Sequence, residues 1–346
     1  MDNDISDRKK SNILLSYADE VWKEMNKCSR KQNVSMSQDG QLKCWQLKKP
    51  EISEYSAIMI DGAEDMNAAI LDIFRNQKCA RVVVGDPHQE IFSFKGVVNA
   101  FQMIRETHAY RLTQSFRFGP KIASVAQCVL KNLTELQGQT LVGGRRRDFV
   151  RSGHMPMPSP DARLTRAYLA RTHVGLYKWS LEMCYDEKYS SKSMGFAGGL
   201  EAYEFDDVLD IYNLSKPEKQ ESINKDFFRK FRTVSDLDQF ATKIDDIELS
   251  NKIKMFKHSG DKTPRHIKRL KEKCSSKLAN SDIIFSTVHR AKGLEFDWVT
   301  LLDDFNLGRN QEDGKGEWNI LYVAITRAKQ YLDIDSGVLD DLGYNE

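Results

Sequence analysis

Acidic side chains follow a short apolar run near the start of the chain. Residues 57–66 read A-I-M-I-D-G-A-E-D-M, so Asp61 comes directly after four apolar residues. A buried parallel strand has this pattern when it delivers a carboxylate to the ligand-binding edge of an α/β sheet. Such an aspartate often holds the Mg²⁺ of a bound nucleoside triphosphate, and a second carboxylate beside it usually orients the attacking water. Here the next residue is Gly62, so the pattern predicts a magnesium ligand and leaves hydrolysis open.

A second apolar run ends in polar and aromatic residues. Residues 82–96 read V-V-V-G-D-P-H-Q-E-I-F-S-F-K-G, and Gln89 follows the turn after the predicted strand, where an amide can sense a phosphate. Phe92 and Phe94 alternate with a serine and precede Lys95, a combination that suits base stacking on single-stranded nucleic acid. The alternative is that both phenylalanines are ordinary core residues.

Three later segments contain further arginines and polar residues that could contact a nucleotide or nucleic acid. In L-T-Q-S-F-R-F-G, residues 112–119, Arg117 could reach a nucleotide as an arginine finger while Phe116 packs on a base; the alternative for Arg117 is a surface salt bridge. In F-S-T-V-H-R-A-K-G-L-E-F, residues 285–296, the candidates for phosphate contacts are Thr287, His289 and Lys292, and Glu295 is expected to face a ribose or a phosphate-sensing arginine. His289 could equally be a hydrogen-bonded loop histidine. In W-N-I-L-Y-V-A-I-T-R-A-K, residues 318–329, Arg327 is expected at the start of a helix, as a second phosphate-sensing arginine.

The elements that must position these residues alternate between strand and helix, which predicts a parallel sheet covered by helices. Residues 41–47 are expected to be a short strand or loop, and residues 138–161 a loop or linker. Asp65 or Asn67 is the expected N-cap of the helix at 67–75. The expected strands are 57–60, 80–84, 110–112, 167–171, 283–286 and 298–302; the expected helices are 1–35, 67–75, 119–133, a segment ending near 184, most of 200–280, and 319–329.

Composition narrows the class of protein. The chain has 346 residues, of which 40% are hydrophobic and 29% charged, as in soluble globular proteins of two domains or more. It lacks a run of 18 apolar residues, and its N-terminal segment lacks the apolar core of a secretory signal. The six cysteines are scattered, which suits a reducing compartment and argues against zinc or a disulfide framework. Net charge is +2, but residues 251–280 hold ten Lys or Arg against two acids; this run could track a phosphate backbone or be a solvated helix face.

In order and spacing, these stretches resemble the C-terminal helicase motifs of the UvrD/Rep-type superfamily 1 DNA helicases, and they are most similar to the eukaryotic F-box branch. The stretch D-G-A-E-D resembles the family's D-E-A-Q-D, and V-G-D-P-H-Q-E-I-F-S-F-K-G and L-T-Q-S-F-R-F-G resemble its third and fourth motifs. The other matches are A-R-T-H-V, G-G-L-E-A-Y-E-F-D-D-V-L-D-I-Y, T-V-H-R-A-K-G-L-E-F-D and E-W-N-I-L-Y-V-A-I-T-R-A-K. Together they run from about Asp39 to Leu332, and an ordered series is far more specific than any single match.

The resemblance implies a fold and a set of roles. The fold would be α/β and P-loop NTPase-like: the C-terminal part of a first RecA-like domain (1–111), then a second RecA-like domain (112–196 and 281–346) interrupted by a mainly helical insertion (197–280). Asp61 would coordinate Mg²⁺, and Gln89 would sense the γ-phosphate of ATP. Arg117 and Arg327 would stabilise the transferring phosphoryl group. The implied nucleotide contacts are Phe116, Gly293 and Glu295, and the implied DNA contacts are Phe92, Phe94, Lys95, Thr287, His289 and Lys292.

Two features of the family's ATP site are missing from the sequence. Residues 1–60 contain one glycine, Gly40, and no G-x-x-x-x-G-K-[ST] phosphate cradle; the stretch 308–316 has the wrong spacing and the wrong place. The catalytic glutamate is replaced by Gly62, and Glu64 lies two residues too far along to replace it. Losing such a carboxylate commonly costs on the order of 10²–10⁴ in rate. Truncation would explain the missing cradle but not Gly62.

Three functional hypotheses remain open from the sequence. The first is an ATP-dependent 3′–5′ DNA helicase, truncated or catalytically impaired, that acts in the nucleus on recombination and stalled forks and has recombination or ubiquitin-ligase partners in a longer form. The second is an inactive module that binds single-stranded DNA or a helicase partner. The third is a non-functional translation product.

Overall fold

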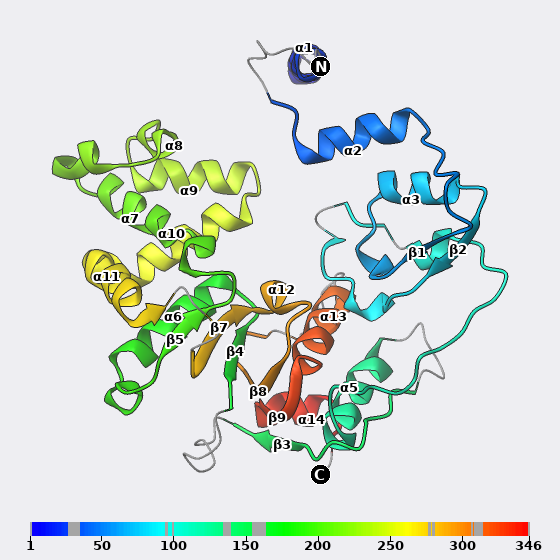
Figure 1. The fold of residues 1–346 in the computed structure, drawn as a ribbon. Coiled ribbons are helices and arrows are strands. Elements are labelled where there is room, and N and C mark those ends of the chain that lie inside the picture. Colours follow the sequence, from blue (N-terminus) through cyan, green and yellow to red (C-terminus); the bar gives the residue numbers. More distant parts are fainter. Residues whose placement is uncertain are drawn as a thin grey trace. The chain divides into compact units, whose positions relative to one another are not determined.

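The structure is a computed structural model. It describes residues 2–26, 35–93, 96–98, 100–133, 140–153, 164–275, 278, 281–305, 307 and 314–344, with the backbone alone for 2–10 and 314–315. The chain divides into two compact units, Met1–Pro87 with Phe92–Thr107, and His88–Ile91 with His108–Glu346 (Figure 1). The short segment His88–Ile91 therefore belongs to the second unit, although the residues on both sides of it belong to the first.

The first unit contains a two-stranded parallel sheet, in which Ala57 of β1 lies opposite Ala80 of β2. The helix between these strands begins after Asn67, whose side chain accepts from the backbone N–H of Ile70 at 2.9 Å, as one of the two expected N-caps. A small core consists of Ala63, Met66, Leu71 and Ala100, and Ile60 of β1 and Val83 of β2 pack against it. The elements are α1 (Asp2–Met25), α2 (Gln38–Leu47), β1 (Ala57–Ile60), α3 (Ala68–Arg75), β2 (Ala80–Val83) and α4 (Ala100–Met103).

The prediction for residues 41–47 is wrong, because this segment is helical and forms most of α2. The helix begins at an N-cap, because the hydroxyl of Ser37 accepts from the N–H of Gly40 at 3.0 Å. A capped start stabilises a short helix even where its apolar residues are irregularly spaced.

The second unit is built on a seven-stranded sheet in the order β3-β9-β8-β4-β7-β5-β6, and every neighbouring pair of strands is parallel. Helices α5 and α13 pack together and against β3, β8 and β9, whereas α6 packs on β4 and β7. This is the predicted α/β architecture, and it is consistent with a RecA-like helicase domain. The elements are α5 (Pro120–Asn132), β3 (Phe149–Ser152), β4 (Arg166–Ala170), α6 (His173–Tyr185), β5 (Met194–Phe196), β6 (Cys274–Ser275), β7 (Ile283–Thr287), α12 (Val288–Ala291), β8 (Phe296–Leu301), α13 (Gly314–Ile325), β9 (Ala328–Ile334) and α14 (Ser336–Asp341).

Three further sequence predictions are wrong. The expected strand at 110–112 is irregular, and its apolar side chains Tyr110 and Leu112 point to solvent with no ladder partner. A strand, β3, lies inside the expected linker 138–161 and pairs with β9. The expected helix 319–329 ends at Ile325, because the residues from Ala328 onward pair with β3 and β8 as β9. Long-range strand pairing, which sequence windows do not contain, decides the last two cases.

A helical segment connects β5 to β6, as the high charge and helical periodicity of residues 200–280 predict. Its own core comprises Ile211, Leu214, Ile223, Phe228, Leu237, Ala241, Leu249 and Ile253. The helices are α7 (Phe205–Leu214), α8 (Asp226–Arg229), α9 (Val234–Lys243), α10 (Ile247–Ser259) and α11 (Thr263–Lys273). No helix in the described parts of the chain is both long enough and apolar enough to cross a bilayer.

Candidate nucleotide-facing site

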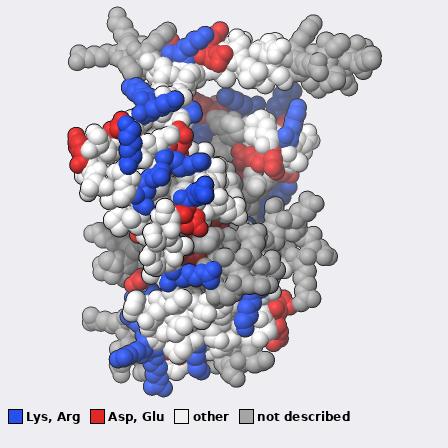
Figure 2. Space-filling view, turned by 90° about the vertical axis from the view of Figure 1, so that its right-hand side faces the viewer, with Lys and Arg blue, Asp and Glu red and all other residues white. Residues whose placement is uncertain are grey.

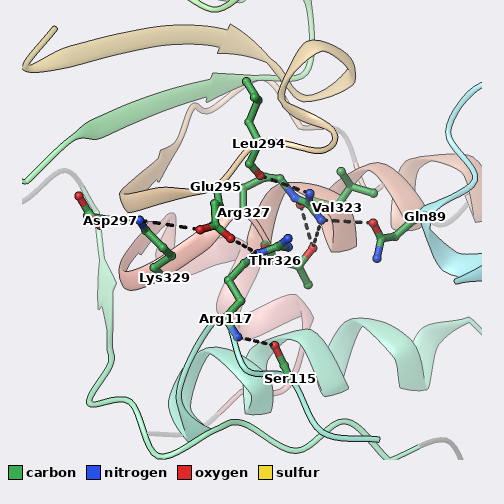
Figure 3. A network of polar contacts seen from close by, with 10 residues as sticks. All are labelled: Gln89, Ser115, Arg117, Leu294, Glu295, Asp297, Val323, Thr326, Arg327 and Lys329. Carbon is green, nitrogen blue, oxygen red and sulfur yellow. Dashed lines mark hydrogen bonds and ion pairs between the residues drawn. The ribbon is translucent and has the colours of Figure 1, made fainter. Parts of the chain in front are cut away.

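Arg327 lies in the connection between α13 and β9, not at the start of a helix as the sequence analysis expected. Its side chain is 2% exposed. Its guanidinium donates to the carbonyl oxygens of Val323 (Nε, 2.9 Å) and Leu294 (Nη1, 3.4 Å) and to the hydroxyl of Thr326 (3.0 Å) (Figure 3). Several neutral oxygens thus hold one orientation of the charged group.

Gln89 reaches this arginine from a distant part of the sequence. Arg327 Nη2 donates to Gln89 Oε1 at 3.3 Å. The backbone around Gln89 is held as well: Lys292 Nζ donates to the Gln89 carbonyl at 2.8 Å, and Asn319 Nδ2 donates to the Glu90 carbonyl at 2.9 Å. The ring of His88, which is buried, lies edge-on to another ring on α13 at 6.1 Å. The predicted phosphate sensor is therefore fixed to the second unit.

Arg117 approaches the same place from the segment before α5. Its Nη1 donates to the Thr326 carbonyl at 2.9 Å, and its Nε forms an ion pair with Glu295 Oε2 at 3.1 Å. Glu295 also faces Lys329 at 4.0 Å, and Lys329 pairs with Asp297 at 2.9 Å. Glu295, expected to contact the nucleotide, therefore contacts an arginine here. An arginine partner is one of the two contacts that the sequence predicts for Glu295.

The adjacent candidates for nucleotide contacts are exposed or conformationally special. Phe116 is 82% exposed, so its ring face is open to a planar partner. Gly293 has φ +82°, a left-handed conformation that a side chain would strain. Phe116 is next to Arg117 in the sequence, and Gly293 lies two residues before Glu295. Both residues are therefore close in sequence to the ion pair of Arg117 and Glu295.

The predicted DNA-facing residues after β7 lie in a partly buried setting. Thr287 is buried, and its hydroxyl has no hydrogen-bond partner among the described residues. Burial, together with the nearby positive charge of Arg171, lowers the pKa of His289 to about 4, so the ring is neutral near pH 7. His289 can therefore donate to a phosphate only as a neutral imidazole. Lys292 is engaged with the carbonyl of Gln89.

Two functional candidates escaped the sequence analysis, although both lie in quoted motifs. Arg171 of A-R-T-H-V and Glu317 of E-W-N form a multiple ion pair, with Nε at 2.8 and 3.0 Å from the two carboxylate oxygens and Nη2 at 2.6 Å from Oε1. The pair joins the end of β4 to α13 beside His289. An arginine at the end of a predicted strand was the available signal, because the expected strand 167–171 ends at Arg171.

In the first unit, Asp61 follows β1 and is exposed, as a metal-binding carboxylate must be. Gly62 has φ +72°, so a glutamate there would adopt a strained left-handed conformation. Glu64 is 6% exposed, and its Oε2 accepts from the N–H of Asp86 at 3.1 Å, which makes it part of the fold. Phe92 is half-buried. Phe94 and Lys95 lie outside the described residues.

The chemistry of these residues can be compared with that of magnesium and ATP, taking each unit by itself. Mg²⁺ is usually held by one or two carboxylates together with phosphates and water, so Asp61 alone is compatible with it. Among the described residues there is no group of three His, Cys, Asp or Glu that could hold a metal without a phosphate. Gln89, Arg117 and Arg327 fit a terminal phosphate. The sequence contains no G-x-x-x-x-G-K-[ST] cradle for the other phosphates, so the residues present do not fit a complete site.

The basic run at 251–280 is largely engaged within the protein. Lys252 is buried between Asp207 and Glu204. The other contacts are Lys257–Asp238 at 2.6 Å, Lys271–Asp206 at 2.6 Å, Lys268–Glu272 at 3.8 Å, Arg269 to the Cys184 carbonyl at 3.0 Å and Lys273 to the Ser190 carbonyl at 3.1 Å. On the face drawn in Figure 2, Lys and Arg side chains lie at several separate places, with Asp or Glu beside some of them. The run therefore resembles an ion-paired helix surface more than a free phosphate track.

Comparison with known proteins identifies the class. The family model of the UvrD-like helicase C-terminal domain matches residues 161–336, more than half of the chain, so the chain belongs to the UvrD-like helicase family. It is 35% identical over 348 residues to F-box DNA helicase 1 of Gallus gallus, an alignment that covers 92% of this chain and 33% of the relative. It is 26% identical over 359 residues to F-box DNA helicase protein 1 of Schizosaccharomyces pombe, covering 94% of this chain and 39% of the relative. The chain spans well under half of the length of both relatives. The predicted family resemblance is confirmed.

Proposed function

We propose that this chain carries the arginine-bearing side of the ATP site of a DNA helicase that moves 3′ to 5′ along single-stranded DNA. The observation that carries the proposal is that Arg117 and Arg327 both contact Thr326 and that Gln89 contacts Arg327. Two oriented guanidinium groups and an amide form the donor set that stabilises a transferring phosphoryl group. In this proposal the first unit is the C-terminal part of one RecA-like domain, and the second unit is another RecA-like domain with a helical insertion.

The contacts suggest how each residue acts. Arg117 and Arg327 supply positive charge to the terminal phosphate, and Gln89 registers whether that phosphate is present. Phe92 lies three residues beyond Gln89 in the chain, so a shift of Gln89 would be passed along the backbone to it, past the carbonyls of residues 89 and 90 that Lys292 and Asn319 contact. Phe92 and Phe94 stack on bases of the strand, while Thr287 and His289 contact its phosphates. Asp61 supplies one ligand to Mg²⁺, and the ion neutralises phosphate charge when it is bound.

Nucleotide-dependent DNA binding tests this proposal. Anisotropy of a labelled oligothymidylate should show an affinity that changes when Mg-ATP is added, and Arg117→Ala with Arg327→Ala should abolish the change. Arg232→Ala removes a charge from an exposed arginine in the helical segment and serves as the matched control. An affinity that is the same with and without Mg-ATP would contradict the helicase proposal.

A second candidate is a module that binds single-stranded DNA without using ATP. The left-handed Gly62 and the buried Glu64 favour it, because neither can supply the water-orienting carboxylate. In that case the affinity for single-stranded DNA depends on salt and does not change when Mg-ATP is added. The Phe94→Ala variant weakens it by about 1–3 kcal/mol. Phe94→Tyr keeps a ring for stacking and should retain most of the affinity.

The biological setting is proposed from the relationship to the F-box DNA helicases. A nuclear location, roles in recombination and at stalled replication forks, and recombination or ubiquitin-ligase partners of a longer form all belong to this proposal. Immunofluorescence of the tagged endogenous protein, before and after replication stress, tests the location and the response.

A further inference from the structure

Three consecutive arginines lie in the loop that leads into β3. Residues 143–151 read G-G-R-R-R-D-F-V-R. Arg145, Arg146 and Arg147 are all exposed, and the described structure contains no carboxylate in ion-pairing distance of any of them. We call these three residues the arginine loop. It differs from the basic run on α10 and α11, where four of the nine described cations form ion pairs and two more contact carbonyl oxygens.

The arginine loop is anchored at both ends. On one side, the N–H of Gly144 donates to the Phe118 carbonyl at 2.8 Å, and a Cβ on Gly143 would lie 2.2 Å from the backbone of Gly119. On the other side, the carboxylate of Asp148 accepts from the N–H groups of Lys121 (3.2 Å) and Ile122 (2.7 Å) at the start of α5. The acid inside the sequence run is thus occupied by the helix terminus and does not neutralise the arginines.

Aromatic rings orient the basic groups on this side of the sheet. The guanidinium of Arg147 lies 5.1 Å from the ring centre of Phe149, which stacks on Tyr331 at 5.1 Å and 10°. Arg151 lies over Trp298 at 4.3 Å and is bound by Asp333. A guanidinium stacked on a ring keeps its in-plane N–H donors free for a phosphate. The ring of Phe149 already has neighbours on its stacked faces, so it serves to hold Arg147, not to stack on a base.

We infer that the arginine loop is a sequence-independent contact for the phosphate backbone of DNA, separate from the predicted stacking residues Phe92 and Phe94. The inference rests on the proposed DNA binding and assigns a further part of the chain to it. Charge complementarity identifies the partner: an anchored loop that presents three unpaired guanidinium groups matches a run of phosphates, and Arg is the side chain best suited to phosphate oxygens. The contact adds affinity without reading bases.

The salt dependence of DNA binding by the full chain tests this inference. Replacing Arg145, Arg146 and Arg147 together by alanine should lower the slope of log K against log salt for oligothymidylate by about 2, because each lost phosphate contact on a single strand contributes roughly 0.7. At about 0.1 M salt the same slope corresponds to an affinity about 100-fold weaker. The triple lysine variant keeps the charges and should restore the slope.

A matched control removes the same net charge elsewhere. Lys230, Arg232 and Lys243 are exposed basic residues of the helical segment, and the described structure shows no ion pair for them. Their triple alanine variant should bind DNA like the wild type, and melting curves of all variants should coincide. If the wild type binds and both triple variants weaken equally, the arginine loop has no special role, although the proposed function stands. If the wild type does not bind DNA at all, both the inference and the proposed function are overturned.

Discussion

Arg117 and Arg327 bind the same residue, Thr326, at two different polar groups. Arg117 Nη1 donates to the Thr326 carbonyl at 2.9 Å, and Arg327 Nη2 donates to its hydroxyl at 3.0 Å. The two arginines nevertheless differ in setting, because Arg327 is buried whereas the side chain of Arg117 is 30% exposed. A shared anchor lets the two positive charges lie side by side without either one depending on a bound nucleotide.

This difference in burial predicts different costs of truncation. Arg327→Ala should lower the free energy of unfolding by about 2–4 kcal/mol, since it leaves several buried acceptors unpaired. Arg117→Ala should cost less than about 1 kcal/mol, as for an exposed ion pair. Urea denaturation of the two variants measures both values. Equal costs would show that burial does not separate the roles of the two residues.

A second prediction concerns the buried charge cluster on the sheet. Asp333 is fully buried and binds Arg166 and Arg151, each at 2.8 Å, as well as the Trp298 Nε1–H at 2.7 Å. Asp333→Asn keeps the shape but removes the carboxylate that both guanidinium groups contact, and one of these groups is nearly inaccessible. We expect a loss of about 3–5 kcal/mol in the free energy of unfolding.

Asp340→Asn supplies the control for that experiment. Asp340 is exposed on α14, so the same change of charge should alter stability by less than about 0.5 kcal/mol. Chemical denaturation at fixed pH compares the two variants. A small change in the free energy of unfolding of Asp333→Asn would mean that solvent screens the two arginine charges and that the carboxylate contributes little.

Part of the site could be predicted from the sequence, and part depended on contacts that no sequence window contains. Gln89, Arg117 and Arg327 were chosen from their neighbours, and the structure brings these three together. The predicted position of Arg327 at the start of a helix is wrong, because the residues that follow it form β9 by pairing with β3 and β8. The anchoring role of Asn319, and of Lys292 toward a carbonyl, required knowing that residues 88–91 belong to the second unit. The ion pair of Arg171 and Glu317 could not be predicted, because only their contact in the folded chain distinguishes these two residues from others.

The low pKa of His289 predicts how stability depends on pH. Its pKa is about 4 in the folded chain, chiefly because the ring is buried, against an ordinary value of 6.5. Between these values the unfolded chain binds more protons, so the free energy of unfolding should rise with pH from about 4 to 6.5 and then level off. The contribution of this residue is at most about 3 kcal/mol. It is complete above pH 6.5 and is lost as the pH falls toward 4.

Denaturation midpoints of the wild type and His289→Gln across that range measure the contribution. The variant cannot take up the proton, so the difference in stability between the two proteins should depend on pH only between about 4 and 6.5. His108→Gln, at an exposed histidine of the second unit, is the control and should follow the wild-type profile. If stability depended on pH in the same way in all three proteins, His289 would not be the cause of the pH dependence.

The last prediction concerns the unequal stability of the two units. The sheet of the first unit has two strands, and its apolar side chains Met59 and Val82 are 70% and 41% exposed. A two-stranded sheet is marginal by itself, and unpaired strand edges invite local opening. The seven-stranded sheet instead buries β4 and β7 on all sides. Limited proteolysis should therefore cleave within residues 1–110 before residues 165–335, as mass spectrometry of the fragments would show. Cleavage of the two regions at the same rate would contradict this, and an added single-stranded oligonucleotide should leave the order unchanged, because the difference arises from packing and not from the ligand.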